Sequence, residues 1–244
     1  MATPRFYCPA PLEAHQTLEL PQELAHHALR VLRLKPGSDI VLFNGQGGEY
    51  PGRLLAEGRK AWAELDAHRP REAELPGEIT LMQGIASGDK MDWIVEKAVE
   101  LGASRLVPVT AQRSVLQLSG DRLAKRLAHW ERVAQSASEQ CGRNRIMRID
   151  APRRLAECLE NENPAARSTL LCHPETGESL EQALGVCGEN IALLVGPEGG
   201  WSDEELETAR RFSVRPVTFG SRVLRTETAG LAMIAAVCAL RGWV

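Results

Sequence analysis

Aromatic residues are scarce in this sequence: four phenylalanines, five tryptophans and two tyrosines make up 5% of its 244 residues. With so few rings and no aromatic RNA-binding signature, a sheet that stacks bases on aromatic side chains is not expected. The longest apolar run is too short and too rich in alanine to span a bilayer. No apolar stretch follows the basic residue near the start, so we expect no secretory signal. The hydrophobic content of 43% and the charged content of 25% are ordinary for a globular chain and exclude wholesale disorder.

Several motifs that would define a chemistry are also missing. The six cysteines are scattered without a C-x-x-C pair, a spacing that predicts reduced thiols in a cytoplasmic protein rather than a zinc site or a disulfide framework. There is no G-x-x-x-x-G-K-[ST], no G-x-G-x-x-G after a strand, no G-x-S-x-G and no H-E-x-x-H. The adjacent His26 and His27 would face different directions on a helix. The sequence therefore predicts no metal site and gives no support to nucleotide hydrolysis or a Rossmann-type cofactor.

Charge is distributed unevenly along the chain, although the net charge is only −3. Residues 105–154 hold eleven Lys or Arg against four Asp or Glu, whereas residues 155–210 hold two against twelve. Arginine outnumbers lysine in the basic block, which favours bidentate contact with phosphate or carboxylate. A solvated helix face paired with the acidic block explains the same pattern equally well. A nucleic-acid partner is thus possible on charge alone but not established by it.

The sequence pattern differs between the first 72 residues and the rest of the chain. Residues 1–72 contain short strand-like runs at 39–44 and 62–67 separated by turn signals, which indicates a small antiparallel β unit. The polar stretch 67–78 contains two prolines and is typical of a linker. From residue 73 to 244, strands at 78–85, 105–109, 168–173, 190–196 and 214–219 alternate with helices at 88–102, 121–140, 202–211 and 227–241. Such alternation predicts an α/β domain with a mostly parallel sheet.

Two glycine- or arginine-bearing loops in the last third carry the strongest functional signal. GPEGG (196–200) follows an apolar strand, and FGSRVLRTETAG (219–230) follows the next strand along the chain. In an open α/β sheet, ligands bind beyond the carboxyl ends of the strands, where both loops would lie. Glycine-rich strand-to-helix turns are nevertheless common and often bind nothing, so the pattern alone favours a site only modestly.

These segments resemble a known family. The pairing of LLVGPEGGWSDEE with FGSRVLRTETA is similar to the SPOUT superfamily of S-adenosylmethionine-dependent RNA methyltransferases, and within it to the small-subunit ribosomal RNA uridine-N3 methyltransferases, the RsmE family. HHALRVLRLKPGSDIVLFNGQGGEY (26–50), GDKMDWIVEKAVELGA (88–103) and SASEQCGRNRI (136–146) agree with it. The resemblance implies a PUA-like β-barrel over residues 1–72, a SPOUT domain with a C-terminal trefoil knot over 73–244, a homodimer, and 16S ribosomal RNA as substrate.

The resemblance also implies where the cofactor and the RNA bind. S-adenosyl-L-methionine would be held in the knot by backbone groups of three loops, at Leu171, Cys172, His173, Gly196, Pro197, Glu198, Gly199, Gly200, Phe219, Gly220, Val223, Leu224 and Arg225. Uracil N3 carries a proton that must leave, so a base or a cation that stabilises the developing anion is needed. The nearest candidates by position are Arg225 and Glu227, followed by Glu198. RNA contacts would fall to His27, Arg30, Arg33, Arg113, Arg143, Asn144 and Arg145.

Two other functions remain open on the sequence. A SPOUT enzyme with another target, such as a ribose 2′-hydroxyl of transfer RNA, would usually lack the β-barrel, and the HHALRVLRL segment argues against it. A non-catalytic RNA-binding assembly factor would keep the fold without needing intact GPEGG and LRTET loops. A cofactor-binding titration would discriminate the second case. The sequence does not indicate which uridine is modified or whether free RNA or the assembled subunit is the substrate.

Overall fold

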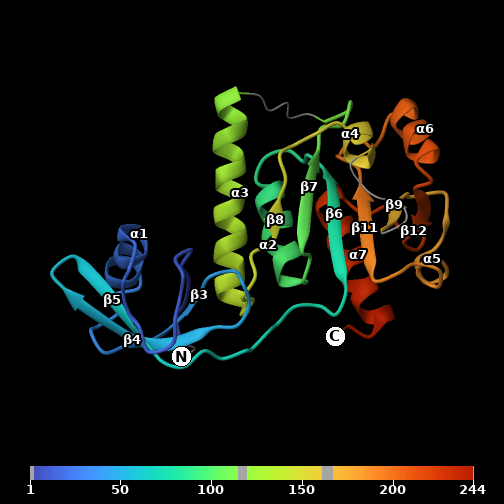
Figure 1. Cartoon of the computed structure of the whole chain (residues 1–244). Helices are drawn as coiled ribbons and strands as arrows, with labels where there is room; N and C mark the ends of the chain where they lie inside the picture. Colours follow the sequence, from blue (N-terminus) through green and yellow to red (C-terminus); the bar gives the residue numbers. More distant parts are fainter. Residues whose placement is uncertain (1–2, 115–119, 161–166, 244) are drawn as a thin grey trace. The chain divides into compact units, whose positions relative to one another are not determined.

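The computed structural model describes residues 3–114, 120–160 and 167–243 (Figure 1). By internal contacts the chain divides into two units. The first consists of Met1–Glu74 together with Ser138–Ile146, and the second of Leu75–Ala137 together with Met147–Val244. The sequence-based boundary after residue 72 lies two residues earlier, and no pattern in the sequence indicated that 138–146 belongs with the N-terminal residues.

The first unit is built on a five-stranded sheet in the order β1-β3-β4-β5-β2. Its pairs are antiparallel except for β1 with β3, which is parallel. Gly45, Gly47 and Gly48 all have positive φ in the turn between β3 and β4, so GQGG is a hairpin connection as the sequence predicted. The strands are β1 (Arg5–Tyr7), β2 (Thr17–Glu19), β3 (Asp39–Phe43), β4 (Tyr50–Glu57) and β5 (Lys60–Leu65).

A short helix, α1 (Gln22–His26), continues into a π-helical turn, η1 (His27–Val31), beside this sheet. Ala25 and Ala28 point into the core of the first unit, where they join Phe6, Ile40 and other buried side chains. His26, His27, Arg30 and Arg33 are exposed, whereas Leu29 and Leu34 pack against this core. This geometry leaves a basic, exposed segment on the surface of the first unit.

The second unit contains a seven-stranded sheet in the order β10-β12-β9-β11-β6-β7-β8, and every pair in it is parallel. The two central strands are apolar along most of their length, as expected for parallel strands covered on both faces. The α/β class and the parallel sheet predicted from the alternating pattern are confirmed. The strands are β6 (Glu78–Gly84), β7 (Arg105–Val109), β8 (Arg148–Ile149), β9 (Ser168–Cys172), β10 (Glu178–Ser179), β11 (Asn190–Val195) and β12 (Arg215–Thr218).

Helices cover both faces of this sheet. On β6, Leu81 and Gln83 face Gly230 of α7, whereas Met82 points to the other face and joins a core cluster with residues of α4 and α6. A Cβ on Gly230 would lie 3.0 Å from Leu81 Cδ1, so the glycine allows α7 to pack closely. The helices are α2 (Lys90–Glu100), α3 (Gly120–Cys141), α4 (Leu155–Glu160), α5 (Leu180–Leu184), α6 (Asp203–Arg211) and α7 (Thr226–Arg241).

Local signals explain where several of these helices begin. Ser202 accepts a hydrogen bond from the Glu205 backbone N–H while the Glu205 side chain accepts from the Ser202 N–H, which is the capping box that the sequence predicted for α6. Within the described residues, no helix is long and apolar enough to cross a membrane. The six cysteines are all free, and four of them are buried.

Candidate active site

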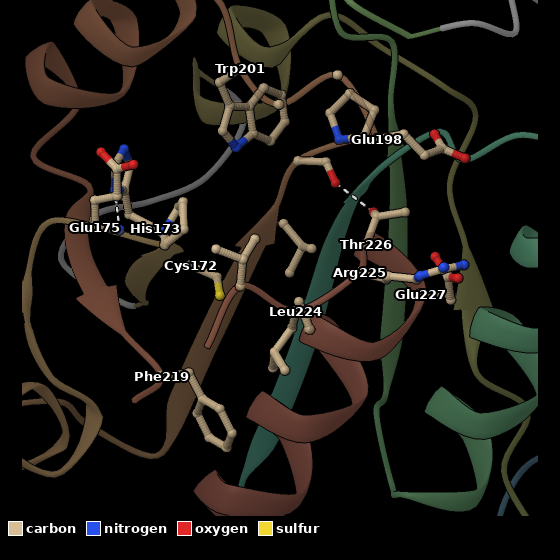
Figure 2. A pocket seen from close by; sticks show the side chains of 18 of the residues that line it. Cys172, His173, Glu175, Glu198, Trp201, Phe219, Leu224, Arg225, Thr226 and Glu227 are labelled. Atoms are coloured by element: carbon tan, nitrogen blue, oxygen red, sulfur yellow. Dashed lines mark hydrogen bonds between the residues drawn. The ribbon is translucent and has the colours of Figure 1, made fainter. Parts of the chain in front are cut away.

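A cavity of about 730 Å³ opens at the carboxyl ends of β9, β11 and β12 and at the start of α7, all within the second unit (Figure 2). Such a volume lies within the range of small-molecule and cofactor sites. Its wall comes from the loops after those three strands. It is lined by Lys90, Cys172, His173, Pro174, Glu175, Val195, Gly196, Pro197, Glu198, Gly199, Gly200, Trp201, Leu206, Phe219, Arg222, Val223, Leu224, Arg225, Thr226, Glu227 and Ala229.

The structure brings most of the predicted cofactor residues to this one wall. All five residues of the GPEGG loop line it, as do Cys172 and His173 after β9. Leu171 does not, because its side chain is buried in the core cluster that contains Trp201. Gly220, which has a positive φ in the loop after β12, is not part of the lining either. Sequence reasoning did not assign Lys90, Trp201 or Thr226 to the site. Lys90 lies outside the two loop motifs, Trp201 directly follows GPEGG, and Thr226 lies within the second loop motif but carries no signal of its own.

The GPEGG loop is held by close backbone approaches. A Cβ on Gly84, at the end of β6, would lie 2.5 Å from the Pro197 nitrogen, and a Cβ on Gly199 would lie 2.9 Å from the Arg113 carbonyl oxygen. Neither position leaves room for a larger residue without moving the loop. Gly84 carries no motif signal, so only the three-dimensional contact identifies it as part of the site.

Thr226, the first residue of α7, ties three segments together below the cavity. Its hydroxyl donates to the Gly196 carbonyl oxygen (Figure 2). The same hydroxyl accepts from Gln83 Nε2 at 2.8 Å. Gln83 also donates to the Gly84 carbonyl oxygen at 3.0 Å and has no solvent exposure. These bonds fix the start of α7 against the ends of β6 and β11.

Charged side chains cluster at one edge of the cavity. Glu198 Oε1 accepts hydrogen bonds from Ser87 N at 3.0 Å, Ser87 Oγ at 2.7 Å and Lys90 Nζ at 2.9 Å. Partial burial alone would raise the pKa of Glu198, but the bonds from Lys90 and Ser87 outweigh it and lower the pKa to about 2. Lys90 Nζ also lies 3.8 Å from Glu227 Oε2, an oxygen that is buried and accepts no hydrogen bond from the described residues. Lys90 thus links the two carboxylates that the sequence named as catalytic candidates.

Arg225 differs from Lys90 because no carboxylate of the described residues forms an ion pair with it. Its backbone caps the N-terminus of α7, and its exposed side chain makes no ion pair or hydrogen bond with any described residue. Arg222, in the same loop, is also exposed and unpaired in the described part of the chain. A guanidinium in this state can meet a developing negative charge on a bound ligand.

Two aromatic rings present nitrogen atoms on the opposite part of the wall. His173 Nδ1 accepts from the backbone N–H groups of Glu175 and Thr176 at 3.2 and 3.0 Å, which places the proton of the neutral ring on Nε2. Trp201 is 8% exposed, and its Nε1 is buried without a hydrogen-bond partner among the described residues. An orphaned donor on a cavity wall fits a ligand that carries hydrogen-bond acceptors.

Arg143 and Asn144, two of the predicted RNA contacts, are buried and paired within the first unit. Arg143 is 3% exposed and forms a two-pronged ion pair with Glu74 inside the first unit. Asn144 has no exposure, donates to the Arg71 carbonyl oxygen and accepts from Arg5. Both side chains hold residues 138–146 within the first unit, because a buried polar group must be paired there.

The remaining RNA candidates lie in different surroundings. Arg113 is exposed, but it donates to the Trp201 carbonyl oxygen at 3.1 Å and so supports the loop after β11. Arg145 is exposed, with only a 3.9 Å approach to Glu72. His27, Arg30 and Arg33 are exposed on and after η1. Of the predicted set, Arg145 and these three keep side chains that a large partner could reach.

Family models match both units. A model described as an RNA methyltransferase domain matches residues 73–238, and one described as an RNA methyltransferase PUA domain matches residues 20–62. Both models describe RNA methyltransferases. A PUA unit, together with a cavity walled by loops of a parallel sheet, agrees with that class. In residues 3–114, 120–160 and 167–243, no group of three His, Cys, Asp or Glu residues could hold a metal ion.

Individual relatives identify the family within the class of RNA methyltransferases. The chain is 32% identical over 94% of its length to a ribosomal RNA small subunit methyltransferase E from Synechocystis, covering 74% of that protein. It is 27% identical to the Bacillus subtilis protein of the same name, covering 93% of this chain and 91% of that one. The crystal structure of a ribosomal RNA small subunit methyltransferase E from Neisseria gonorrhoeae bound to S-adenosyl methionine superposes with a TM-score of 0.90, at 37% identity and 98% coverage of both chains. The chain belongs to the ribosomal RNA small subunit methyltransferase E family.

Proposed function

We propose that the protein transfers a methyl group from S-adenosyl-L-methionine to N3 of a uridine in 16S ribosomal RNA. One observation carries the proposal: the cavity walled by the GPEGG loop holds an unpaired arginine, Arg225, beside a carboxylate, Glu227. The Neisseria gonorrhoeae relative, whose crystal structure contains S-adenosyl methionine, supports this choice of cofactor.

The residues on the wall fit that cofactor. At Gly196, a Cβ would lie 3.1 Å from Trp201 Nε1, so a side chain there would crowd the indole N–H. Trp201 Nε1 and His173 supply ring donors for the oxygen and nitrogen acceptors of an adenosine or an amino acid, and backbone groups of residues 196–200 would hold the rest. When bound, the cofactor supplies an activated methyl group on a sulfonium sulfur. Positioning of the acceptor nitrogen in line with that methyl then carries much of the rate.

The chain's own groups must manage the proton on uracil N3. Glu198 is a poor base, because a carboxylate with a pKa of about 2 and an oxygen that already accepts three hydrogen bonds has little affinity for another proton. Arg225 is nearly always protonated, so its role is to bind the uracil oxygen where the imide charge develops. Glu227, whose Oε2 has no hydrogen-bond donor among the described residues, is the competing candidate that would accept the proton itself.

Three further features belong to the same proposal. The RNA would contact His27, Arg30, Arg33 and Arg145, which are exposed on the first unit. The C-terminal segment would form a trefoil knot, as the resemblance to SPOUT methyltransferases implies. The protein would act as a homodimer in the cytoplasm, where its ribosomal substrate is found.

Mass mapping of ribosomal RNA tests the function directly. Small-subunit RNA from a strain that lacks the gene should miss one methyl group on a uridine base, and the restored gene should return it. Restoration by an Arg225→Ala variant should fail. Identical maps with and without the gene, or a missing methyl on a ribose, would contradict the proposal. A titration of the purified protein with S-adenosyl-L-methionine separates an enzyme from a non-catalytic assembly factor.

A further inference from the structure

Helix α3 carries a row of basic side chains on one face. Within the second unit, Arg122, Lys125, Arg126, His129 and Arg132 follow one another at spacings of three residues, apart from the adjacent Lys125 and Arg126. These positions place all five on one side of the helix. Another side is buried and includes Trp130, which has no solvent exposure. We call the row the α3 basic face.

The α3 basic face is unfavourable for the isolated helix. Like charges three or four residues apart destabilise a helix, and Arg122 has Lys125 and Arg126 at those two positions. Charges of opposite sign occur at these spacings on α6. On α6, Glu207 pairs with Arg210 at 2.9 Å and with Arg211 at 3.9 Å. A cationic row without such partners is the pattern expected where an external anion supplies the opposite charge.

One neighbouring carboxylate offsets part of this charge. Asp92 of α2 lies 2.7 Å from His129 Nε2 and 3.8 Å from Arg126. Arg122, Lys125 and Arg132 are exposed and have no ion pair with a residue that the structure describes. On α3 itself, Asp121 lies at the first turn and Glu131 falls on the side of the helix away from the row. Three cations therefore remain available to a partner.

We propose that the α3 basic face binds the phosphate backbone of the RNA substrate. With a rise of 1.5 Å per residue, the ten steps from Arg122 to Arg132 span about 15 Å, which is enough to follow several phosphates of one strand. Two of the three unpaired side chains are arginines, whose planar guanidinium matches phosphate geometry. The inference rests on the proposed function for its partner, and it moves the RNA contact of the basic block from Arg143 and Asn144 to α3.

The test compares two sets of substitutions that remove exposed charge. The first variant is Arg122→Gln/Lys125→Gln/Arg132→Gln, and the control is Arg210→Gln/Arg211→Gln on α6. Binding of a small-subunit ribosomal RNA fragment is measured between 50 and 300 mM salt. Each phosphate contact contributes roughly 0.7–0.9 to the slope of log affinity against log salt. The α3 variant should therefore bind more weakly, with a slope reduced by about 2, whereas the control should keep the wild-type slope.

Two companion measurements keep the result decisive. The melting temperature of the α3 variant should stay equal to that of the wild type or rise, because like-charge repulsion is removed. Its affinity for S-adenosyl-L-methionine should be unchanged, because no substituted residue lines the cavity. An unchanged salt slope, or an equal loss in the control, would overturn the assignment of α3. The RNA-binding measurement needs no turnover, so it decides this surface even if the methylation assay fails.

Discussion

Two arginine-bearing segments looked alike in the sequence and differ in the structure. Arg143 lies in a segment that matches a family motif, and so does Arg225. Arg143 is 3% exposed and paired with Glu74, whereas Arg225 is exposed on the cavity wall with no partner among residues 3–114, 120–160 and 167–243. The difference shows that one arginine of a family motif can be buried and paired while another is exposed without a partner among the described residues.

Substitution of Arg225 should give the largest change in activity. Loss of one donor that stabilises charge in the transition state typically lowers turnover by about 10²–10³-fold. We expect Arg225→Ala to show this loss in single-turnover methylation at saturating cofactor and RNA. Arg225→Lys should be impaired almost as badly, because it keeps the charge but loses the planar fork. Glu227→Gln should lose far less; a dead Glu227→Gln enzyme with a near-normal Arg225→Ala enzyme would reverse the assignment.

Substitution of Arg143 should have the opposite signature. Arg143→Ala leaves Glu74 without its main partner, and removal of one member of a buried ion pair costs about 3 kcal/mol. Urea denaturation should show this loss of stability, while the affinity for S-adenosyl-L-methionine stays unchanged. Arg145→Ala is the matched control, because the Arg145 side chain is 53% exposed and its substitution should cost little. Equal stability of the two variants would contradict the structural role of Arg143.

A methyl group on Gly84 should weaken cofactor binding without unfolding the protein. The added Cβ would meet the Pro197 nitrogen at 2.5 Å and the Gly196 carbonyl carbon at 2.9 Å, so the GPEGG loop must shift. We expect Gly84→Ala to lower the affinity for S-adenosyl-L-methionine about tenfold by calorimetry, a change of roughly 1.4 kcal/mol. Gly188→Ala is the control, since a Cβ there meets nothing within 4 Å and its φ is not positive. Wild-type affinity in Gly84→Ala would show that the loop position does not govern binding.

The smallest effect concerns the pH dependence of stability. The pKa of Glu198 is lowered from 4.5 to about 2 in the folded protein, so the ionised carboxylate favours the folded state. This contribution is fully present above about pH 4.5 and is lost as the pH falls toward 2. The difference in unfolding free energy between wild type and Glu198→Gln should therefore be smaller at pH 3 than at pH 7. A difference that stays constant over this range would contradict the Lys90–Glu198 contact.

The sequence predicted the longer elements of the second unit well, because periodicity is a local signal, but it did not predict β8, α4, β10 or α5. β7 coincides with its predicted range, and α6 begins one residue after its predicted start at 202. The cavity was predictable as far as its loops carried glycine or arginine motifs. Gly84 and Lys90 were not, because their roles depend on contacts with residues more than a hundred positions away. Pairing across such distances leaves no periodic trace in a single sequence.

The same limit explains why the sequence did not indicate the burial of two predicted RNA contacts. Arg143 and Asn144 carry charge and hydrogen-bonding groups typical of nucleic-acid contacts, and nothing nearby in the sequence indicates Glu74 or Arg71 as their partners. Exposed charge of the basic block lies on α3, where the helical spacing could have indicated it, and also at Arg113, Arg145 and Arg148. Composition located the basic block at residues 105–154, but only the burial of each side chain in the structure distinguishes the paired residues of the block from the exposed ones.

The inclusion of Ser138–Ile146 in the first unit has a consequence for biosynthesis. A chain emerging from the ribosome presents Glu74 about seventy residues before Arg143 and Asn144 are made, and Arg5 and Glu49 earlier still. At roughly 5–20 residues per second, the unit waits about 4–14 s for its last segment. During this time Phe6 and the core around Ile40 can pack, but the contacts of Arg5 with Asn144 and of Glu74 with Arg143 cannot form. The N-terminal unit therefore completes its fold only after much of the catalytic unit has been synthesised.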